Sequence, residues 1–222
     1  MGDVIKNHLV VMPAFNEAAR IGDVVRAVRR VAPVVVIDDG SVDGTGQQAE
    51  AAGTMVLRQP SNQGKGCALE RGCSYAREQG YAVVITMDAD GQHDPADLDA
   101  FLQMHAARPE AMLIGDRTHT WRREMPWVRR WTNRGMSWLL SRRIGYKIPD
   151  TQCGYRLYPV DALSVCVNLA PGFAAESEIL IRLARAGIPI LSVPIRTIYG
   201  DQQSKIQPGS DMLRFFRMLR QV

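Results

Sequence analysis

Short apolar runs alternate with stretches of helical periodicity through the first half of the chain. The runs Leu9–Pro13 and Val34–Asp38 are nearly continuous in apolar residues, which is typical of strands buried on both faces. Between them, Ala18–Val31 repeats apolar residues at helical spacing. Further strands are predicted at Thr54–Leu57, Ala82–Met87 and Ala111–Gly115, and further helices at Asp43–Ala52, Lys65–Gln79 and Pro95–Ala107. This alternation predicts an α/β fold with a single doubly wound, mostly parallel sheet.

The second half of the chain has a different character. Residues 117–147 contain all four tryptophans and nine Lys/Arg residues, so that aromatic and apolar side chains are interleaved with arginines. Beyond them, strands are predicted at Thr151–Tyr158 and Ile188–Ile195, on either side of a helix at Ala175–Ala186. The chain ends in Asp211–Val222, where arginines recur every three residues among apolar side chains. This last pattern predicts an amphipathic basic helix appended to the sheet.

Charge is distributed unevenly along the chain. Residues 1–115 hold 10 Lys/Arg and 15 Asp/Glu, a net charge of −5, whereas residues 116–222 hold 17 and 8, a net charge of +9. A basic half indicates an anionic partner, which could be a nucleic acid, a phosphorylated substrate or an anionic lipid. No apolar run approaches the roughly 20 residues that span a bilayer, and no signal peptide opens the chain. We therefore expect a cytoplasmic protein.

Two carboxylates separated by one residue lie on the turn that leaves the strand Ala82–Met87. Asp88 and Asp90 can share a hard cation through oxygen ligands, and Mg²⁺ or Mn²⁺ bound in this way keeps positions for substrate phosphates. An Asp-x-Asp pair by itself is common in turns. Its place at the carboxyl end of a strand, where α/β sheets bind ligands, strengthens the prediction of a divalent metal site.

Two further polar clusters follow predicted strands at the same edge of the sheet. Asp39 ends the second strand, where its carboxylate can accept hydrogen bonds from a base or a ribose. The alternative for this turn is that Ser41 or Asp43 caps the next helix, and both interpretations hold together if Asp43 is the cap and Asp39 faces a ligand. The glycines of Asn62–Gly66 can bring backbone close to a phosphate, and Lys65 adds positive charge at the start of the following helix.

The combination of these motifs resembles the family 2 glycosyltransferases, whose fold is the Rossmann-like GT-A fold. The motifs that carry the resemblance occur in order at Pro13–Glu17, Asp38–Thr45, Asn62–Gly66 and Asp88–Gln92. Further matches are Gly115–Arg117, Asp150–Arg156, Glu176–Glu178 and Ser204–Lys205. The resemblance covers nearly the whole chain and is close to the polyprenyl-phosphate branch that contains dolichyl-phosphate mannose synthase. It implies that a hexose moves from a GDP- or UDP-sugar to a polyprenyl phosphate, with inversion at the anomeric carbon.

The resemblance also implies roles for particular residues. It implies a nucleoside site at Pro13, Phe15, Asn16, Glu17 and Asp39, with Lys65 near the diphosphate. It implies that the metal is held by Asp88, Asp90 and Gln92. The residues expected to be catalytic are Asp90, Arg117, Glu176 and Glu178. Further substrate contacts are expected from Asp116, Arg130, Asp150, Arg156, Ser204 and Lys205. We accordingly expect one domain, 1–222, with a nucleotide-sugar-binding half at 1–115, an acceptor-binding half at 116–210 and the basic helix at 211–222.

Two classes of acceptor stay open. A polyprenyl phosphate, with a second pKa near ~6, is its own nucleophile at neutral pH and needs only positioning cations, such as Arg117 and Arg130. A lipid or saccharide hydroxyl would need a carboxylate base. The candidates for that base are Asp116, Asp150, Glu176 and Glu178. The chain departs from the branch on this side, with Tyr199, Gln202 and Asp116 where Arg, Gly and Ser are usual.

Membrane contact is predicted from the basic half. The segment 117–147 and the helix Asp211–Val222 suit the headgroup region of an anionic bilayer, although both could instead pack on the core. We therefore expect an enzyme peripheral to the inner face of a membrane.

A nucleotidyltransferase is an alternative enzyme class, but it would have a glycine-rich basic loop where this chain has Pro13–Glu17. A basic nucleic-acid-binding protein is the alternative outside enzymes, but the acidic ligand edge argues against a nucleic-acid partner.

Overall fold

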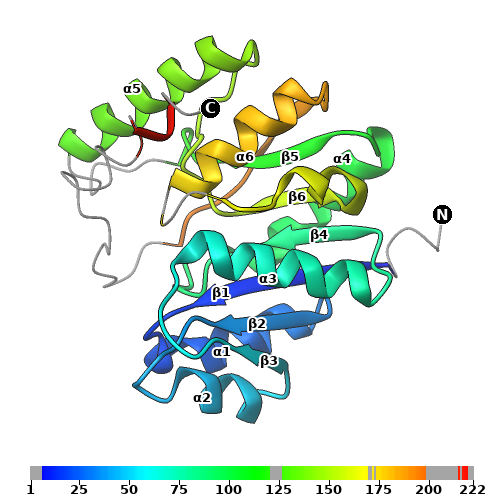
Figure 1. Cartoon of the computed structure of the whole chain (residues 1–222), viewed down its shortest axis with the longest axis vertical. Coiled ribbons are helices and arrows are strands. Elements are labelled where there is room, and N and C mark those ends of the chain that lie inside the picture. The colour runs from blue at the N-terminus through cyan, green and yellow to red at the C-terminus, as the bar shows by residue number, and fades with distance from the viewer. Residues whose placement is uncertain are drawn as a thin grey trace.

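A computed structural model of the chain describes residues 7–120, 127–169, 172, 174–198, 215 and 217–219, with the side chains of 127–129 left out (Figure 1). The strands are β1 (His8–Ala14), β2 (Val34–Asp38), β3 (Met55–Arg58), β4 (Val83–Thr86), β5 (Met112–Asp116), β6 (Arg156–Pro159) and β7 (Ile190–Pro194). The helices are α1 (Ala18–Arg29), α2 (Thr45–Ala51), α3 (Lys65–Glu78), α4 (Leu98–Ala107), α5 (Trp127–Ile144) and α6 (Ala174–Arg185), with 3₁₀ turns at Pro95–Asp97 and Val160–Val165.

The strands form one sheet in the order β3-β2-β1-β4-β6-β5-β7. All neighbouring pairs are parallel except those of β6, which runs antiparallel to both β4 and β5. Ala14 pairs with Asp38 and Val11 pairs with Thr86, so β1, β2 and β4 end at the same edge. The polar residues that follow these three strands therefore leave the sheet close to one another. The mostly parallel sheet predicted from the sequence is confirmed.

The sheet is buried between helices, which explains the apolar runs. Every residue of β2 and β4 is buried, as expected for strands covered on both faces. Figure 1 shows α3 and α6 in front of the sheet and α1 behind it. The core joins the strands to α1, α3, α4 and α6 through one cluster of buried apolar side chains. The outcome is a rigid sheet whose carboxyl edge carries the polar loops.

The strand predicted at Thr151–Tyr158 is shorter than expected. Only its last part forms β6; Thr151–Tyr155 is not a strand, although the carbonyl of Tyr155 still accepts from the N–H of Gly115 in β5 at 2.9 Å. The carbonyls of Thr151 and Cys153 accept hydrogen bonds from the Arg156 side chain, so they need no partner strand. The apolar pattern of this stretch could not show this, because it does not reveal where the side chain of Arg156 lies.

The appended basic helix can be followed only in part. Within Asp211–Val222 the structure describes Phe215 and 217–219, which are helical, with Phe215 and Met218 buried and Arg217 exposed. These apolar residues belong to the protein core rather than to an outward face. Of the helices that the structure describes, none combines the length and the apolar character needed to cross a bilayer.

Candidate active site

The loops that follow β1 and β2 are joined by hydrogen bonds. The N–H of Asn16 donates to Ser41 Oγ at 3.0 Å, and Asn16 Oδ1 accepts from the N–H of Val42 at 3.1 Å. The N–H of Glu17 donates to Thr45 Oγ1 at 2.8 Å. Asn16 has a φ of 52°, in the left-handed region that asparagine tolerates, so the chain turns sharply there. The predicted nucleoside-binding residues of this loop are half-buried: Pro13, Phe15, Asn16 and Glu17.

Asp39 is buried at the same edge and holds the loop that precedes α3. Its Oδ1 accepts from Gln59 Nε2 at 2.9 Å and from the N–H of Gln63 at 2.8 Å. Its Oδ2 accepts from the N–H of Gly64 at 2.8 Å. Gly40 permits this approach, because its φ is +73° and a Cβ there would lie 2.5 Å from the backbone of the same loop. Asp39 therefore positions the glycine-rich loop, and its contact with a nucleoside stays a prediction.

Asp43 helps to begin two helices. Its Oδ1 accepts from the N–H of Thr45 in α2, and its Oδ2 accepts from the N–H of Ala18 in α1, each at 3.0 Å. Burial alone would raise the pKa of Asp43, but the hydrogen bonds from Thr45 and Ala18 outweigh it and lower the pKa. Asp43 therefore accepts from the first N–H group of two helices, while the N-cap positions themselves are Gly44 and Glu17.

Lys65, the first residue of α3, bridges two carboxylates from other elements. Its Nζ lies 2.6 Å from Asp88 Oδ1 and 3.1 Å from Glu176 Oε1. Burial alone would lower the pKa of Lys65, but the negative charges of Asp88 and Glu176 outweigh it and raise the pKa. Burial would raise the pKa of Asp88, but Lys65 and His93 lower it overall. Lys65 and Asp88 are therefore held in their charged forms.

Asp90 completes a carboxylate pair that suits a divalent cation. Burial and the negative charge of Asp88 raise the pKa of Asp90, and the N–H of Gln92 donates to Asp90 Oδ1 at 2.9 Å. This local excess of negative charge is what a bound cation would neutralise. No three His, Cys, Asp or Glu side chains gather into a metal cage among the residues described. Two carboxylates and the Gln92 amide instead fit Mg²⁺ or Mn²⁺ sites that leave positions to phosphate oxygens.

The surroundings of Asp88 contain residues that the sequence analysis missed. A Cβ at Gly154 would lie 2.4 Å from Asp88 Oδ2, so only glycine lets the turn before β6 come so close. His93 is buried, with Nε2 3.5 Å from Asp88 Oδ2 and its ring 5.2 Å from that of Tyr155. The place of His93, three residues after Asp90, was the available signal. We interpret both as residues that orient Asp88.

A second missed connection joins the turn after β4 to the segment after β7. The N–H of Arg196 donates to Asp97 Oδ2 at 2.8 Å, and its Nε donates to Asp97 Oδ1 at 3.0 Å. Its guanidinium also lies 3.1 Å from Asp94 Oδ2. The N–H of Ile198 donates to the carbonyl of Gln92 at 3.0 Å. The turn that carries the carboxylate pair is thus fixed from the far end of the chain.

Arg117 and Asp150 form a buried ion pair beyond β5. Arg117 Nε donates to Asp150 Oδ2 at 2.6 Å and its Nη2 donates to Oδ1 at 3.1 Å, a bidentate arrangement. Burial alone would lower the pKa of Arg117, whereas the neighbouring Cys153 and Asp150 raise it. Asp116, at the end of β5, accepts from the N–H and the hydroxyl of Thr118 at 2.9 and 2.7 Å. Both carboxylates therefore have partners within the protein.

Arg156 is buried and holds backbone carbonyls together. Its guanidinium donates to the carbonyls of Cys153 and Glu176 at 2.7 Å each and to that of Thr151 at 2.9 Å. Because its side chain exposes no surface, the expected contact of Arg156 with a substrate is corrected to a brace between the turn before β6 and α6. Glu178 is also buried and is hydrogen-bonded to Arg182, one turn later in α6.

Three expected site residues remain: Arg130, Ser204 and Lys205. Arg130 is half-buried on α5. Ser204 and Lys205 lie outside the described residues. Among those described, the structure brings Lys65 into contact with both Asp88 and Glu176, and the charge of Asp88 acts on the nearby Asp90. The loops of Asn16 and Asp39 lie along the same edge. Arg117 and Asp150 pair with each other beside this cluster, and the negative charge of Asp88 also acts on Arg117.

Comparisons with known proteins find relatives over most of the chain. Residues 9–166 match the family model described as Glycosyl transferase family 2. An uncharacterised protein of Methanocaldococcus jannaschii is 32% identical, over 95% of this chain and 88% of that protein. The undecaprenyl-phosphate mannosyltransferase of Micrococcus luteus is 32% identical, over 90% of this chain and 88% of that enzyme. Glucosyl-3-phosphoglycerate synthase of Mycobacterium tuberculosis, solved with Mn²⁺, UDP-glucose and phosphoglyceric acid, has a similar fold, with a TM-score of 0.76, 20% identity and coverage of 99% of this chain and 82% of that one.

Proposed function

The chain belongs to glycosyl transferase family 2 and is a glycosyltransferase, and we propose that it moves a hexose from a GDP- or UDP-sugar to a polyprenyl phosphate with inversion at the anomeric carbon. The observation that carries this proposal is the meeting of Lys65, Asp88, Asp90 and Glu176 at the carboxyl edge of the sheet. The Micrococcus luteus relative, whose name gives undecaprenyl phosphate as acceptor, supports the acceptor class.

The donor half of the proposal assigns a task to each loop. The residues that would hold a Mg²⁺ or Mn²⁺ ion are Asp88, Asp90 and Gln92, and the ion would neutralise the charge that develops on the leaving nucleoside diphosphate. Lys65 lies at the positive end of the α3 dipole, where its ammonium can accompany the diphosphate. The loops that carry Asn16 and Asp39 would receive the nucleoside.

The proposal of a phosphate acceptor rests on the partners that the structure gives to the candidate base carboxylates. Three of the four carboxylates that could deprotonate a hydroxyl face cations: Asp150 with Arg117, Glu176 with Lys65 and Glu178 with Arg182. A general base needs a lone pair within reach of the proton that it removes. A phosphate monoester, with a second pKa near ~6, arrives deprotonated and needs no such base. This supports a lipid phosphate over a hydroxyl, with Asp116 as the base to test in the second case.

A direct assay separates these acceptors. The purified protein is incubated with Mn²⁺ and a panel of GDP- and UDP-hexoses, and with undecaprenyl phosphate, undecaprenol or a free saccharide in detergent. We expect transfer to undecaprenyl phosphate and none to the two alcohols. Transfer to undecaprenol or to a saccharide that is lost in Asp116→Asn would establish the hydroxyl-acceptor alternative. Salt-dependent binding to DNA without affinity for any sugar nucleotide would instead support the nucleic-acid alternative.

Replacing Asp39 with alanine is expected to weaken donor binding by about 1–3 kcal/mol, because the variant loses an acceptor for the nucleoside and releases the Gly64 loop. Calorimetric titration with GDP and UDP measures the change. Asp43→Ala is the matched control, because Asp43 also accepts backbone hydrogen bonds in this turn but serves the helix starts. The control should lose about 1 kcal/mol of stability and no nucleotide affinity. Unchanged affinity in Asp39→Ala would leave Asp39 as a turn residue.

We also place the enzyme at the inner, cytoplasmic face of a membrane, as a peripheral protein. A polyprenyl phosphate is embedded in a bilayer, so the enzyme would meet it at the membrane surface. The positive charge of residues 116–222 favours an anionic leaflet, which attracts each nearby Lys or Arg by about 1 kcal/mol, an attraction that salt screens.

A further inference from the structure

α5 packs Leu140 on the core and buries polar residues beside it, while it leaves two tryptophans in solvent. Its buried face includes the polar residues Asn133 and Ser137, and the Ser137 hydroxyl is hydrogen-bonded to that of Thr151 at 3.0 Å. Its outward face carries Trp131 and Trp138, which are 68% and 65% exposed. A helix that packs only on its own protein buries tryptophan in preference to asparagine or serine. Large aromatic side chains gathered in solvent mark a surface that another body covers.

The exposed tryptophans lie on one stripe of α5. Trp131 and Trp138 are seven residues apart, which is two helical turns, so they point to the same side and are separated by roughly 10 Å along the axis. Arg134 and Arg142, also exposed, continue this stripe. We call Trp131, Arg134, Trp138 and Arg142 the α5 docking face. Figure 1 shows α5 as an outermost helix beside α6, at the opposite end of the molecule from α2 and β3.

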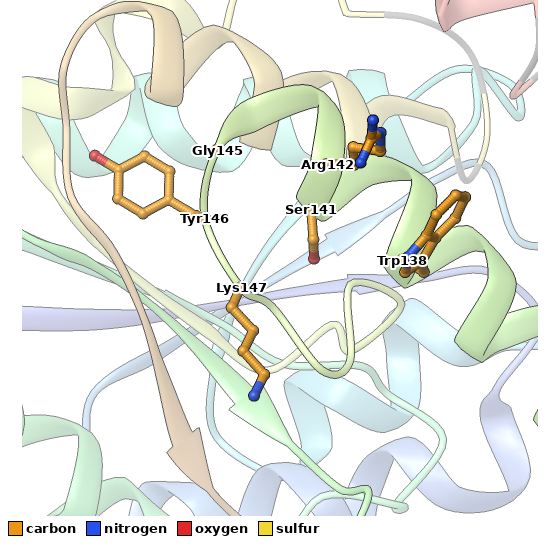
Figure 2. Close-up of a pocket in the computed structure, with 6 residues that line it drawn as sticks. All are labelled: Trp138, Ser141, Arg142, Gly145, Tyr146 and Lys147. Atoms are coloured by element: carbon orange, nitrogen blue, oxygen red, sulfur yellow. The ribbon is translucent and has the colours of Figure 1, made fainter.

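The α5 docking face ends in a shallow hollow of about 320 Å³. The residues that line it are Trp138, Ser141, Arg142, Gly145, Tyr146 and Lys147 (Figure 2). The Ser141 hydroxyl donates to the carbonyl of Ile148 and accepts from its N–H, at 3.1 and 3.0 Å, which fixes the turn after the helix. The Trp138 indole and the side chains of Arg142 and Lys147 are exposed at this hollow, while Tyr146 is half-buried against the core. This is the composition of a surface that receives anionic groups next to apolar ones.

We propose that the α5 docking face lies in the headgroup layer of an anionic membrane. Residues 127–147 contain six Lys/Arg and no Asp/Glu, so this surface is complementary in charge to an anionic leaflet and would repel a second copy of itself. The indole ring is apolar with a polar N–H edge, which suits the bilayer interface. Because Trp131 and Trp138 share one side of the helix, a flat bilayer can receive both together. The proposal rests on the proposed function, which puts the acceptor in a bilayer, and it adds the surface that faces that bilayer.

Vesicle binding with tryptophan fluorescence tests the proposal. Neutral phosphatidylcholine vesicles are compared with vesicles that contain phosphatidylglycerol, at low and at high salt. We expect the whole protein to sediment with the anionic vesicles at low salt, and its fluorescence to be quenched by lipids brominated near the headgroup. Trp131→Ala/Trp138→Ala should lose most of the quenching and bind at least tenfold more weakly. Arg142→Glu/Lys147→Glu should release the protein at low salt.

Matched variants keep the test specific. Arg30, just after α1, and Arg71, on α3, are both exposed. Arg30→Glu/Arg71→Glu therefore changes the net charge equally but away from the α5 docking face, and it should retain more of the binding. Val31 and Met55 are exposed apolar residues elsewhere, and Val31→Ala/Met55→Ala should bind normally. Sedimentation of wild type and both α5 variants to the same extent would overturn the proposal. Failure of the wild type to bind anionic vesicles would also overturn it. That holds equally if the protein dimerises through this face or binds DNA instead.

Transfer assays distinguish this proposal from the proposed function. With undecaprenyl phosphate in detergent micelles, Trp131→Ala/Trp138→Ala should transfer sugar at the wild-type rate, because these residues lie outside the site described above. With the same acceptor in anionic vesicles, its rate should fall in step with its binding. Wild-type protein that binds anionic vesicles through the tryptophans but transfers no sugar to undecaprenyl phosphate in either setting would refute the acceptor and leave the docking face standing.

Discussion

Replacing Asp90 with alanine is expected to lower kcat/KM for transfer by roughly 10³-fold, which corresponds to about 4 kcal/mol of transition-state stabilisation. The negative charge on the departing diphosphate would lose the cation that Asp88 and Asp90 hold together. The fold should be unaffected, because burial and the neighbouring Asp88 already raise the pKa of Asp90 and disfavour its charge. Steady-state kinetics and thermal unfolding of the same preparation measure both effects.

Metal-linked nucleotide binding gives a second readout for Asp90. In the wild type, Mn²⁺ should strengthen the binding of a nucleoside diphosphate, and in Asp90→Ala this dependence should disappear. Asp99→Ala is the matched control, because Asp99 is an exposed carboxylate on α4, close in sequence but on the outside of the helix. It should leave kinetics and Mn²⁺-dependence unchanged. Turnover in Asp90→Ala within a few-fold of the wild type would refute the metal site.

The first half of the fold was predictable because its strands are covered on both faces. Short continuous apolar runs rich in β-branched residues, such as Val34–Asp38, are typical of strands buried on both faces, and the rule that parallel strands end at one edge then predicts Asp39 and Asp88 at the same edge. The contact of Asp43 with the start of the next helix followed from local chemistry, because Thr45 is only two residues away, whereas the contact with Ala18, 25 positions earlier, was not predicted. These features depend on short stretches of sequence, and pattern analysis therefore reaches them.

The second half depends on contacts between residues far apart in the chain. Arg117 and Arg156 are both arginines near a proposed acceptor site, and nothing in their local sequence distinguishes a free cation from a buried brace. The structure pairs Arg117 with Asp150, 33 positions later, and ties Arg156 to the carbonyl of Glu176, 20 positions later. The orientation of β6 has the same origin, since its neighbours β4 and β5 come earlier in the chain.

Replacing Lys65 with methionine is expected to lower the free energy of unfolding by about 3 kcal/mol, the lower end of the cost of breaking a buried ion pair, because Asp88 keeps some exposure to water. Methionine has a similar length and no charge, so Asp88 and Glu176 would lose the cation between them. Lys65→Arg keeps the charge and should lose much less. Urea unfolding of the three proteins measures the difference, with and without Mn²⁺ and a nucleoside diphosphate.

The cation dependence of this loss connects stability to the active site. If Asp88 belongs to a metal site, Mn²⁺ with a nucleoside diphosphate should restore part of the stability of Lys65→Met by supplying positive charge to Asp88, and should restore less in Lys65→Met/Asp90→Ala. Adding Glu176→Gln to Lys65→Met should also recover stability, because it removes the second carboxylate that Lys65 neutralises and leaves Asp88 as the main uncompensated charge. A Lys65→Met protein as stable as the wild type, and indifferent to Mn²⁺, would mean that Lys65 neutralises neither carboxylate. If Glu176→Gln restores the stability of Lys65→Met but Mn²⁺ has no effect, the role of Lys65 is instead limited to joining α3 and α6.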